Sequence, residues 1–180
     1  MKGILSIVIL AAAGLAGCAG NRAPDVAGNI RDSLKQAGLS DVTVSQDRDK
    51  GVVTLGGNVK LAPDKDRAEQ IAKSLAGSQV VADQIAVLPA GYEAIAKSVN
   101  SDLDKGIEAN LDAALTQANL KGVSHSTKNG VVTLTGDLNT PQDRTHAETV
   151  AAAVPNVQQV VNKIDVTNRR ATTSEADRSK

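Results

Sequence analysis

The chain has 180 residues, with 20 Lys and Arg against 20 Asp and Glu, and a hydrophobic share of 41% that includes no Phe and no Trp. This length accommodates one or two small domains, whose cores must be built from Val, Ile, Leu and Ala. The balanced charge and the single aromatic residue, Tyr92, disfavour nucleic-acid binding, because duplex binding needs a basic surface and single-strand binding needs aromatic faces.

The first 17 residues are typical of a secretory signal peptide. The positive residue Lys2 precedes the apolar run Ile4 to Leu10, which is too short to span a membrane. The tetrapeptide Leu15-Ala16-Gly17-Cys18 follows, and it resembles the lipobox of bacterial lipoproteins. This resemblance implies that residues 1–17 are removed and that the thiol of Cys18 is acylated.

Acylation of Cys18 would make residues 18–24 a lipid anchor and tether. The resemblance implies two or three acyl chains, and two or more chains hold a protein stably at a membrane, whereas one holds it only marginally. Cys18 is the only cysteine, so the chain has no disulfide. The next residue is Ala19, not the Asp that tends to retain Gram-negative lipoproteins at the inner membrane. We therefore expect attachment to the outer membrane, with the protein facing the periplasm.

Residues 25–88 show the order helix, strand, strand, helix, strand. Apolar residues recur every four positions in the first helix, alternate in strands on either side of the turn Lys50-Gly51, and line a second helix before a last strand over 80–87. In chain order the apolar positions are Val26, Ile30 and Leu34, then Val42 and Val44, then Val53, Leu55 and Val59, then Ala68, Ile71, Ala72 and Leu75. Asp25 and Asp64 lie where a carboxylate favours the start of each helix.

Residues 89–101 are predicted to be a helical linker that begins after the breaker Pro89-Ala90-Gly91. Five apolar residues share one helical face: Tyr92, Ile95, Ala96, Val99 and Leu103. This stripe could run into the next helix, with Gly106 as its weak point. Two interpretations stay open. The helix is either a spacer, or it packs on one of the flanking repeats and fixes the angle between them.

Residues 102–166 repeat the first pattern. KNGVVTLTGDL (128–138) matches DKGVVTLGGNV (49–59) at six of eleven positions, every matched pair 79 residues apart. Gly51 and Gly130 belong to tight turns, and Gly57 and Gly136 interrupt the strands, so all four are predicted to be structural turn glycines. Asp102 is predicted to lie at the start of the first helix of this second repeat. Residues 167–180 carry no periodic apolar pattern and are predicted to be a disordered tail.

The element order, the repeated G-V-V-T-L-x-G and the closing V-x-x-x-I-x-V resemble the BON domain, a small envelope module, here in duplicate behind a lipobox. The resemblance implies an α+β fold: two tandem αββαβ domains, each a short mixed sheet with two helices on one face. For dual-BON outer-membrane lipoproteins it also implies phospholipid binding by the first helix of the second copy, here 107–118. At the entrance of that helix we assign lipid binding to Leu103, Lys105 and Ile107.

The sequence offers little for catalysis. Cys18 is assigned to the anchor, and the two histidines, His125 and His146, have no counterparts in the first copy and no metal-ligand spacing around them, so we expect surface residues. The carboxylates are scattered, and no glycine-rich segment leads into a helix as a phosphate cradle would. We therefore expect no enzyme, no cofactor and no metal site.

These observations lead to one main functional hypothesis. The protein is a non-catalytic, lipid-anchored envelope protein whose two BON modules bind phospholipid and support outer-membrane integrity or stress resistance. The alternative is an adaptor that binds a protein of an outer-membrane assembly or secretion complex, by strand addition or by multivalent contact.

Overall fold

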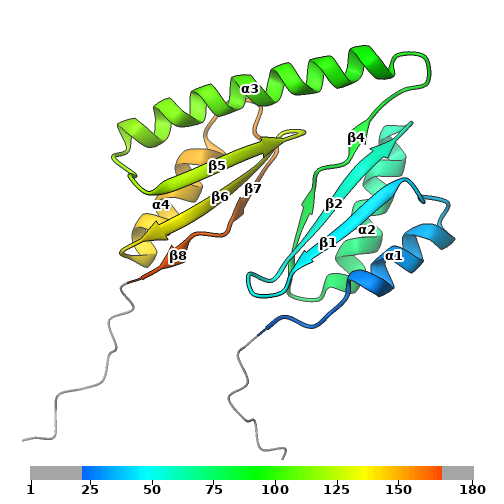
Figure 1. The fold of residues 1–180 in the computed structure, drawn as a ribbon, viewed down its shortest axis with the longest axis horizontal. Helices are drawn as coiled ribbons and strands as arrows, with labels where there is room; N and C mark the ends of the chain where they lie inside the picture. The colour runs from blue at the N-terminus through cyan, green and yellow to red at the C-terminus, as the bar shows by residue number, and fades with distance from the viewer. Residues whose placement is uncertain (1–21, 168–180) are drawn as a thin grey trace, which may run out of the picture.

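The computed structural model describes residues 22–167, which form two small α+β domains, one from each repeat (Figure 1). The predicted signal peptide, Cys18 and nearly all of the predicted tail lie outside the described residues. Domain 1 comprises α1 (Ala27–Gln36), β1 (Val42–Asp47), β2 (Val52–Val59), α2 (Ala62–Ala76), β3 (Val80–Asp83) and β4 (Ala86–Val87). Domain 2 comprises α3 (Glu93–Gln117), β5 (Val123–Lys128), β6 (Val131–Leu138), α4 (Pro141–Ala152), β7 (Gln159–Asn162) and β8 (Asp165–Val166).

Each domain contains a mixed sheet around one central strand. In domain 1, β2 pairs antiparallel with β1 and parallel with both β3 and β4. In domain 2, β6 pairs antiparallel with β5 and parallel with both β7 and β8. The continuous last strand predicted over 80–87 is wrong. The carboxylate of Asp83 accepts a hydrogen bond from the backbone N–H of Ile85, which ends β3 before β4 begins. In domain 2 the amide oxygen of Asn162 accepts from the N–H of Ile164, between β7 and β8.

The two helices of each domain cover one face of its sheet, as the resemblance to the BON domain implies. Val53 and Leu55 of β2 are fully buried, and so are their counterparts Val132 and Leu134 of β6. The helices contribute mainly isoleucine, leucine and alanine to these cores, in place of the absent aromatic residues. Leu75 departs from the predicted core, because its side chain on α2 is 37% exposed.

The helix starts are only partly as predicted. Asp64 lies in the first turn of α2, as expected for an acidic residue near the positive end of a helix. Asp25 lies outside α1, whose first backbone N–H groups donate instead to the side-chain oxygen of Gln46. Asp102 lies inside α3, because the linker and the first helix of the second repeat form one helix.

The strand glycines are required by close backbone approaches. Gly57 has φ 83° and Gly136 has φ 121°, and a Cβ atom on either would collide with a backbone carbonyl oxygen, that of Asp41 or of Gly122. The turn glycines Gly51 and Gly130 also have positive φ, which side chains rarely adopt.

The domains pack against each other through the sheet faces that carry no helices. Val52 and Ala82 of domain 1 meet Val131 and Val161 of domain 2 in a small buried cluster. These are two pairs of equivalent positions, 79 residues apart, so the contact is approximately twofold symmetric. Gln159 extends it: its amide donates to the carbonyl oxygen of Val81 at 2.7 Å and accepts from the N–H of Asp83 at 3.2 Å.

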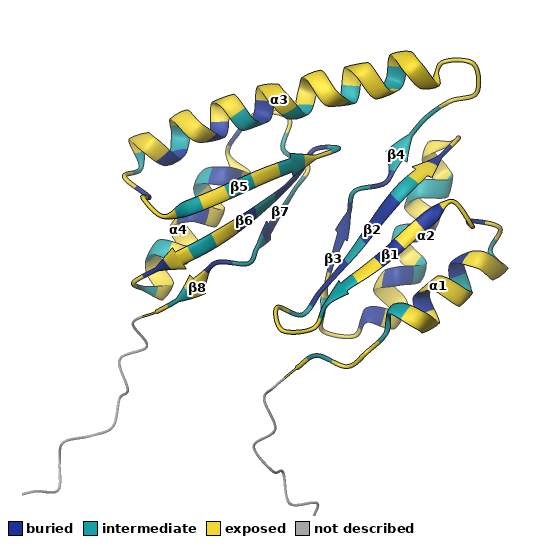
Figure 2. Cartoon of the chain, in the orientation of Figure 1, coloured by how far each residue is buried: buried dark blue, intermediate teal, exposed yellow. Residues whose placement is uncertain are grey.

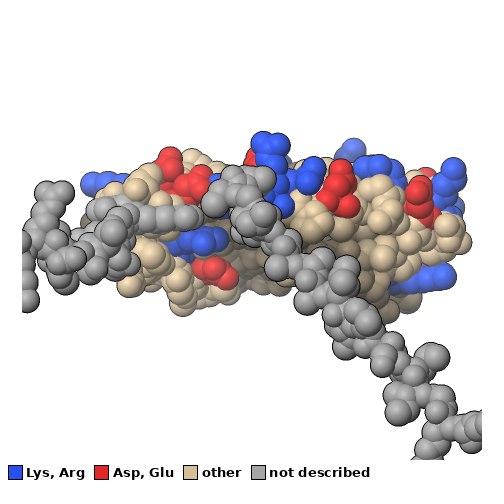
Figure 3. Space-filling model, turned by 90° about the horizontal axis from the view of Figure 1, so that it is seen from below, with Lys and Arg blue, Asp and Glu red and all other residues tan. Residues whose placement is uncertain are grey.

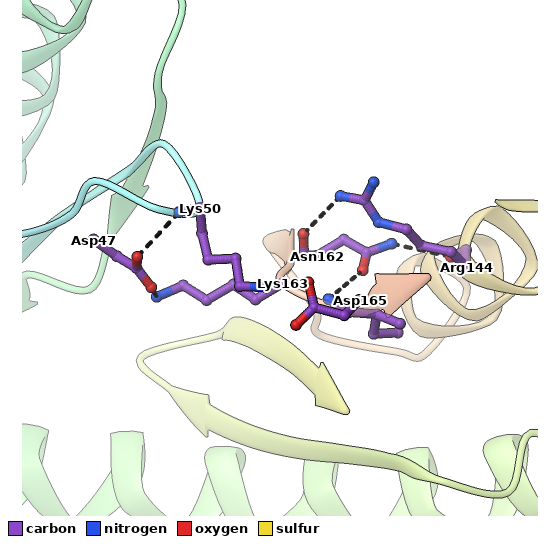
Figure 4. Close-up of polar contacts among 7 residues, drawn as sticks. Asp47, Lys50, Arg144, Asn162, Lys163 and Asp165 are labelled. Carbon is purple, nitrogen blue, oxygen red and sulfur yellow. Dashed lines mark hydrogen bonds and ion pairs between the residues drawn. The ribbon is translucent and has the colours of Figure 1, made fainter. Parts of the chain in front are cut away.

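Ion pairs close the end of this interface that carries the turn between β1 and β2 (Figure 4). Lys163 pairs with Asp47 at 3.1 Å, and Lys50 pairs with Asp165. Burial alone would raise the pKa of Asp47, but hydrogen bonds from Lys163 and from the backbone of Lys50, together with the charge of Lys163, outweigh burial and lower it. At the opposite end of the interface the amide of Asn129 donates to the carbonyl oxygen of Gln84 at 2.7 Å.

Candidate functional site

The most unusual element is α3, a helix of 25 residues that only partly lies on its own domain. Its buried residues, Ile107, Leu111 and Leu115, all belong to the C-terminal part. The segment from Glu93 to Leu103, about 15 Å long at 1.5 Å per residue, extends past domain 2 toward the end of domain 1 that carries β4 (Figure 1). We call residues 93–103 the overhang of α3.

The overhang leaves an apolar stripe in contact with solvent (Figure 2). The exposed fractions are 65% for Tyr92, 64% for Ile95, 50% for Val99 and 47% for Leu103. These residues continue the helix face that Ile107 buries in the domain core, so a face built for apolar contact remains uncovered. The stripe itself is exposed, while the helix that carries it contacts β4 of domain 1.

Lysine side chains flank the overhang. Lys60 of domain 1 is close enough to Glu93 to affect it: the pKa of Glu93 is lowered, mainly by backbone hydrogen bonds at the helix start and also by the charge of Lys60. Leu61, next to Lys60, is itself 61% exposed. Lys97 and Lys105 line an open hollow of about 490 Å³ on one side of the helix, together with residues of domain 1 such as Asn58 and Leu88.

A second hollow, of about 410 Å³, lies where the start of the packed part of α3 meets both domains. We call it the inter-domain cleft. Its lining combines five aliphatic side chains, four amide side chains, one lysine, one aspartate and one glycine: Ile85, Val87, Leu103, Ile107, Val157, Asn100, Asn129, Asn156, Gln158, Lys65, Asp104 and Gly130.

The three residues assigned to lipid binding are divided between these hollows. Leu103 and Ile107 line the inter-domain cleft, although Ile107 is 2% exposed and belongs mainly to the core of domain 2. Lys105 lines the other hollow and pairs with Asp102 at 3.3 Å. The structure thus brings together Leu103 and Ile107 but not Lys105.

Two carboxylates near the cleft are held by the protein itself. Asp104 accepts hydrogen bonds from the backbone N–H groups of Asn129 at 2.8 Å and Gly130 at 2.9 Å, which fix the β5–β6 turn against α3. Asp83 is 8% exposed and lies 4.0 Å from the ammonium group of Lys65. Burial raises the pKa of Asp83, against the opposing effects of the Ile85 N–H and the Lys65 charge.

Sequence reasoning found the stripe but not the cleft. The spacing of the stripe residues indicated an apolar helix face, yet only the structure shows that no residue within 22–167 covers it. Lys65, Asn156 and Gln158 lie in separate elements, and no sequence signal connects them, because they meet only when the two domains dock.

Both histidines were predicted to be surface residues, and only His146 is one. His146 is exposed on α4, whereas the side chain of His125 is only 12% exposed, and its Nε2 lies 2.8 Å from a carboxylate oxygen of Asp112. His125 takes the place of Val44 of the first copy, between the sheet and the covering helix. Within residues 22–167 there is no group of three or more His, Cys, Asp or Glu side chains placed to hold a metal. No helix within this range is long and apolar enough to cross a bilayer.

The sequence pattern that defines the BON domain matches this chain twice, over residues 23–89 and 103–168. The chain belongs to the BON domain family. A search among curated proteins found no match. Because both BON matches coincide with the two structured repeats, the overhang of α3 is the segment that joins one BON domain to the next.

Two solved structures similar to this tandem BON chain are of CdsD, described as a structural protein of the type III secretion system of Chlamydia trachomatis. One, of its C-terminal domain, has 14% identity and a TM-score of 0.31, with 78% of this chain and 65% of that chain covered. The other has 14% identity and a TM-score of 0.36, with 77% and 90% covered. We draw nothing about function from likenesses of this size.

Proposed function

We propose that this protein is a non-catalytic, lipid-anchored envelope protein that binds phospholipid through the overhang of α3 and supports the integrity of the outer membrane. The observation that carries the proposal is the apolar stripe Tyr92, Ile95, Val99 and Leu103, whose side chains are about half to two-thirds exposed. A helix with an exposed apolar face and lysines beside it, here Lys97 and Lys105, is the kind of element that lies in a membrane interface.

The attraction is expected to be apolar more than electrostatic. The chain has no net charge, and Lys97 and Lys105 share their surroundings with acidic residues: Asp102, Asp104 and Glu108. Figure 3 shows the face opposite α3, where Lys and Arg are interspersed with Asp and Glu. Charges of both signs are mixed on that face and around Lys97 and Lys105, so anionic lipid should strengthen binding only modestly.

The adaptor alternative gains no support from the outer strands of the sheets. The guanidinium group of Arg31 on α1 donates to the carbonyl oxygen of Val44 on β1 at 3.2 Å. In domain 2 the carboxylate of Glu108 on α3 accepts from the N–H of Thr127 on β5 at 3.1 Å. Helix side chains therefore occupy part of one edge of each sheet, the β1 edge and the β5 edge, where a strand could otherwise be added.

Vesicle binding tests the proposal. We would use the chain from residue 18 onward with Cys18→Ser, here called the unacylated chain, so that any binding is due to the domains. Burying the exposed part of Ile95 is worth about 1–2 kcal/mol, so Ile95→Asp should weaken binding to phospholipid vesicles about tenfold or more. Ser98→Asp adds the same charge to an exposed position of the same helix outside the stripe and should have little effect.

Equal losses in Ile95→Asp and Ser98→Asp would show that added charge, not the stripe, determines binding. No association of the unacylated chain with vesicles at low salt would remove direct phospholipid recognition and leave only the anchor. Mass spectrometry of the mature protein tests the anchor separately: we expect Cys18 to carry acyl chains, and an unmodified thiol would contradict its role.

A further inference from the structure

The inter-domain cleft has the composition of a small amphipathic binding site. Ile85 and Val87 come from domain 1, and Leu103, Ile107 and Val157 come from domain 2, so the apolar lining exists only when the domains are docked. The volume of about 410 Å³ is within the usual range for ligand pockets, about 300–1,000 Å³, and near its lower end. A cavity of this size suits one apolar chain better than two.

The polar lining contains one cation, Lys65, that could pair with a phosphate group. Asp104 is engaged by the backbone of the β5–β6 turn, which leaves Lys65 as the only other charged residue of the lining. The ammonium group of Lys65 is 4.0 Å from Asp83, beyond normal hydrogen-bond length. The side-chain amides of Asn100, Asn156 and Gln158 can donate hydrogen bonds to the oxygens of a phosphodiester.

In the other repeat, the positions equivalent to three cleft residues form hydrogen bonds or ion pairs within the protein. The equivalents of Lys65, Asn129 and Gln158, 79 residues away in the repeat, are all held by bonds within the protein: Arg144 to the carbonyl oxygen of Asn162, Lys50 to Asp165, and Gln79 to Gln46 and Pro24. Inter-domain ion pairs thus close one end of the interface, whereas the other end holds the cleft, the Asn129–Gln84 hydrogen bond and the Lys65–Asp83 pair.

We propose that the inter-domain cleft binds one lysophospholipid, with its single acyl chain against the aliphatic lining and its phosphodiester at Lys65 and the neighbouring amides. This inference rests on the proposed function, since it names one class of lipid bound beside the overhang. It differs in its residues: Lys65, Asn156 and Val157 belong to the cleft, whereas Tyr92 and Ile95 belong only to the exposed stripe.

The test titrates the unacylated chain with lysophosphatidylglycerol below its micelle concentration and follows backbone chemical shifts. We expect saturable one-to-one binding, with the largest shifts around the cleft. Lys65→Ala should weaken binding about tenfold or more, as expected for loss of a charged hydrogen bond. Val157→Asp should weaken it similarly, and Lys73→Ala, an exposed lysine of the same helix α2 outside the cleft, should not change it. A monoacylglycerol, which lacks the phosphate, should bind at least about tenfold more weakly.

The outcomes separate this inference from the proposed function. Unchanged affinity in Lys65→Ala, equal affinity for the monoacylglycerol, or shifts confined to residues 92–99 would overturn the cleft as the site. Ile95→Asp should weaken vesicle binding about tenfold or more and leave lysophospholipid binding intact. Vesicle binding without lysophospholipid binding would overturn this inference alone, and lysophospholipid binding without vesicle binding would overturn only the stripe.

Discussion

Gln159 offers a direct test of how firmly the two BON domains dock. Its amide replaces a neighbouring strand at the edge of β3: it accepts from the N–H of Asp83 at 3.2 Å and donates to the carbonyl oxygen of Val81 at 2.7 Å. A hydrogen bond of this kind contributes about 0.5–1.5 kcal/mol net, so the two together are worth about 2 kcal/mol. Gln159→Ala should therefore shift the docking equilibrium toward separated domains about 30-fold.

Amide hydrogen exchange tests whether the bond between Gln159 and the Asp83 N–H is made, which requires docked domains. In Gln159→Ala the N–H of Asp83 should exchange faster, while the N–H groups of the β2–β3 ladder stay protected, because domain 1 keeps its own core. Gln142→Ala removes an exposed amide from α4, away from the interface, and is the matched control. Equal exchange of the Asp83 N–H in wild type and Gln159→Ala would refute the docking described for these domains, and with it the cleft.

Two further predictions concern single positions in the repeats. Asp83→Asn, which copies the Asn162 of the second repeat, should raise the midpoint of thermal unfolding at pH 7. Burial raises the pKa of Asp83 above its unfolded value, so the ionised carboxylate destabilises the fold at neutral pH, and the gain should vanish as pH falls through the raised pKa; a gain equally large in acid would contradict this cause. Gly136→Ala should lower the free energy of unfolding in urea by about 3 kcal/mol, because φ is 121° and the new Cβ meets the Gly122 carbonyl oxygen. Gly106→Ala, in open space on α3, should raise it by about 1 kcal/mol. Similar effects of the two glycine replacements would show that the backbone conformation at Gly136 is not required.

The repeat explains why so much of each BON fold could be predicted from sequence. Alternating apolar residues on both sides of a turn specify which strand face is buried, and Val53, Leu55, Val132 and Leu134 are indeed the most buried residues of their strands. Two copies with the same spacing make the pattern unmistakable, since chance rarely repeats it at a constant offset. Local chemistry also located the turn at Asn129, whose φ is 49°.

What could not be predicted depends on contacts between distant residues. Asp25 looked like a helix cap, but Gln46 reaches α1 from β1 and takes that role. His125 looked like a surface residue because no sequence pattern shows that α3 covers it. The cleft has no sequence signature for the same reason: Lys65 and Val157 become neighbours only through docking of two domains whose interface is built from Val52, Val131 and a few polar side chains.

Tyr92 allows the central claim, that the overhang of α3 contacts lipid, to be measured without a label. It is the only aromatic residue of the chain, its side chain is 65% exposed, and it lies at the start of the apolar stripe. The unacylated chain would be mixed with vesicles whose phospholipids carry bromine in their acyl chains, which quenches tyrosine fluorescence on contact. Our account predicts strong quenching that Ile95→Asp abolishes and Ser98→Asp preserves. Full retention of Tyr92 fluorescence in vesicle-bound protein would contradict it, because the stripe would then face water while another surface held the lipid.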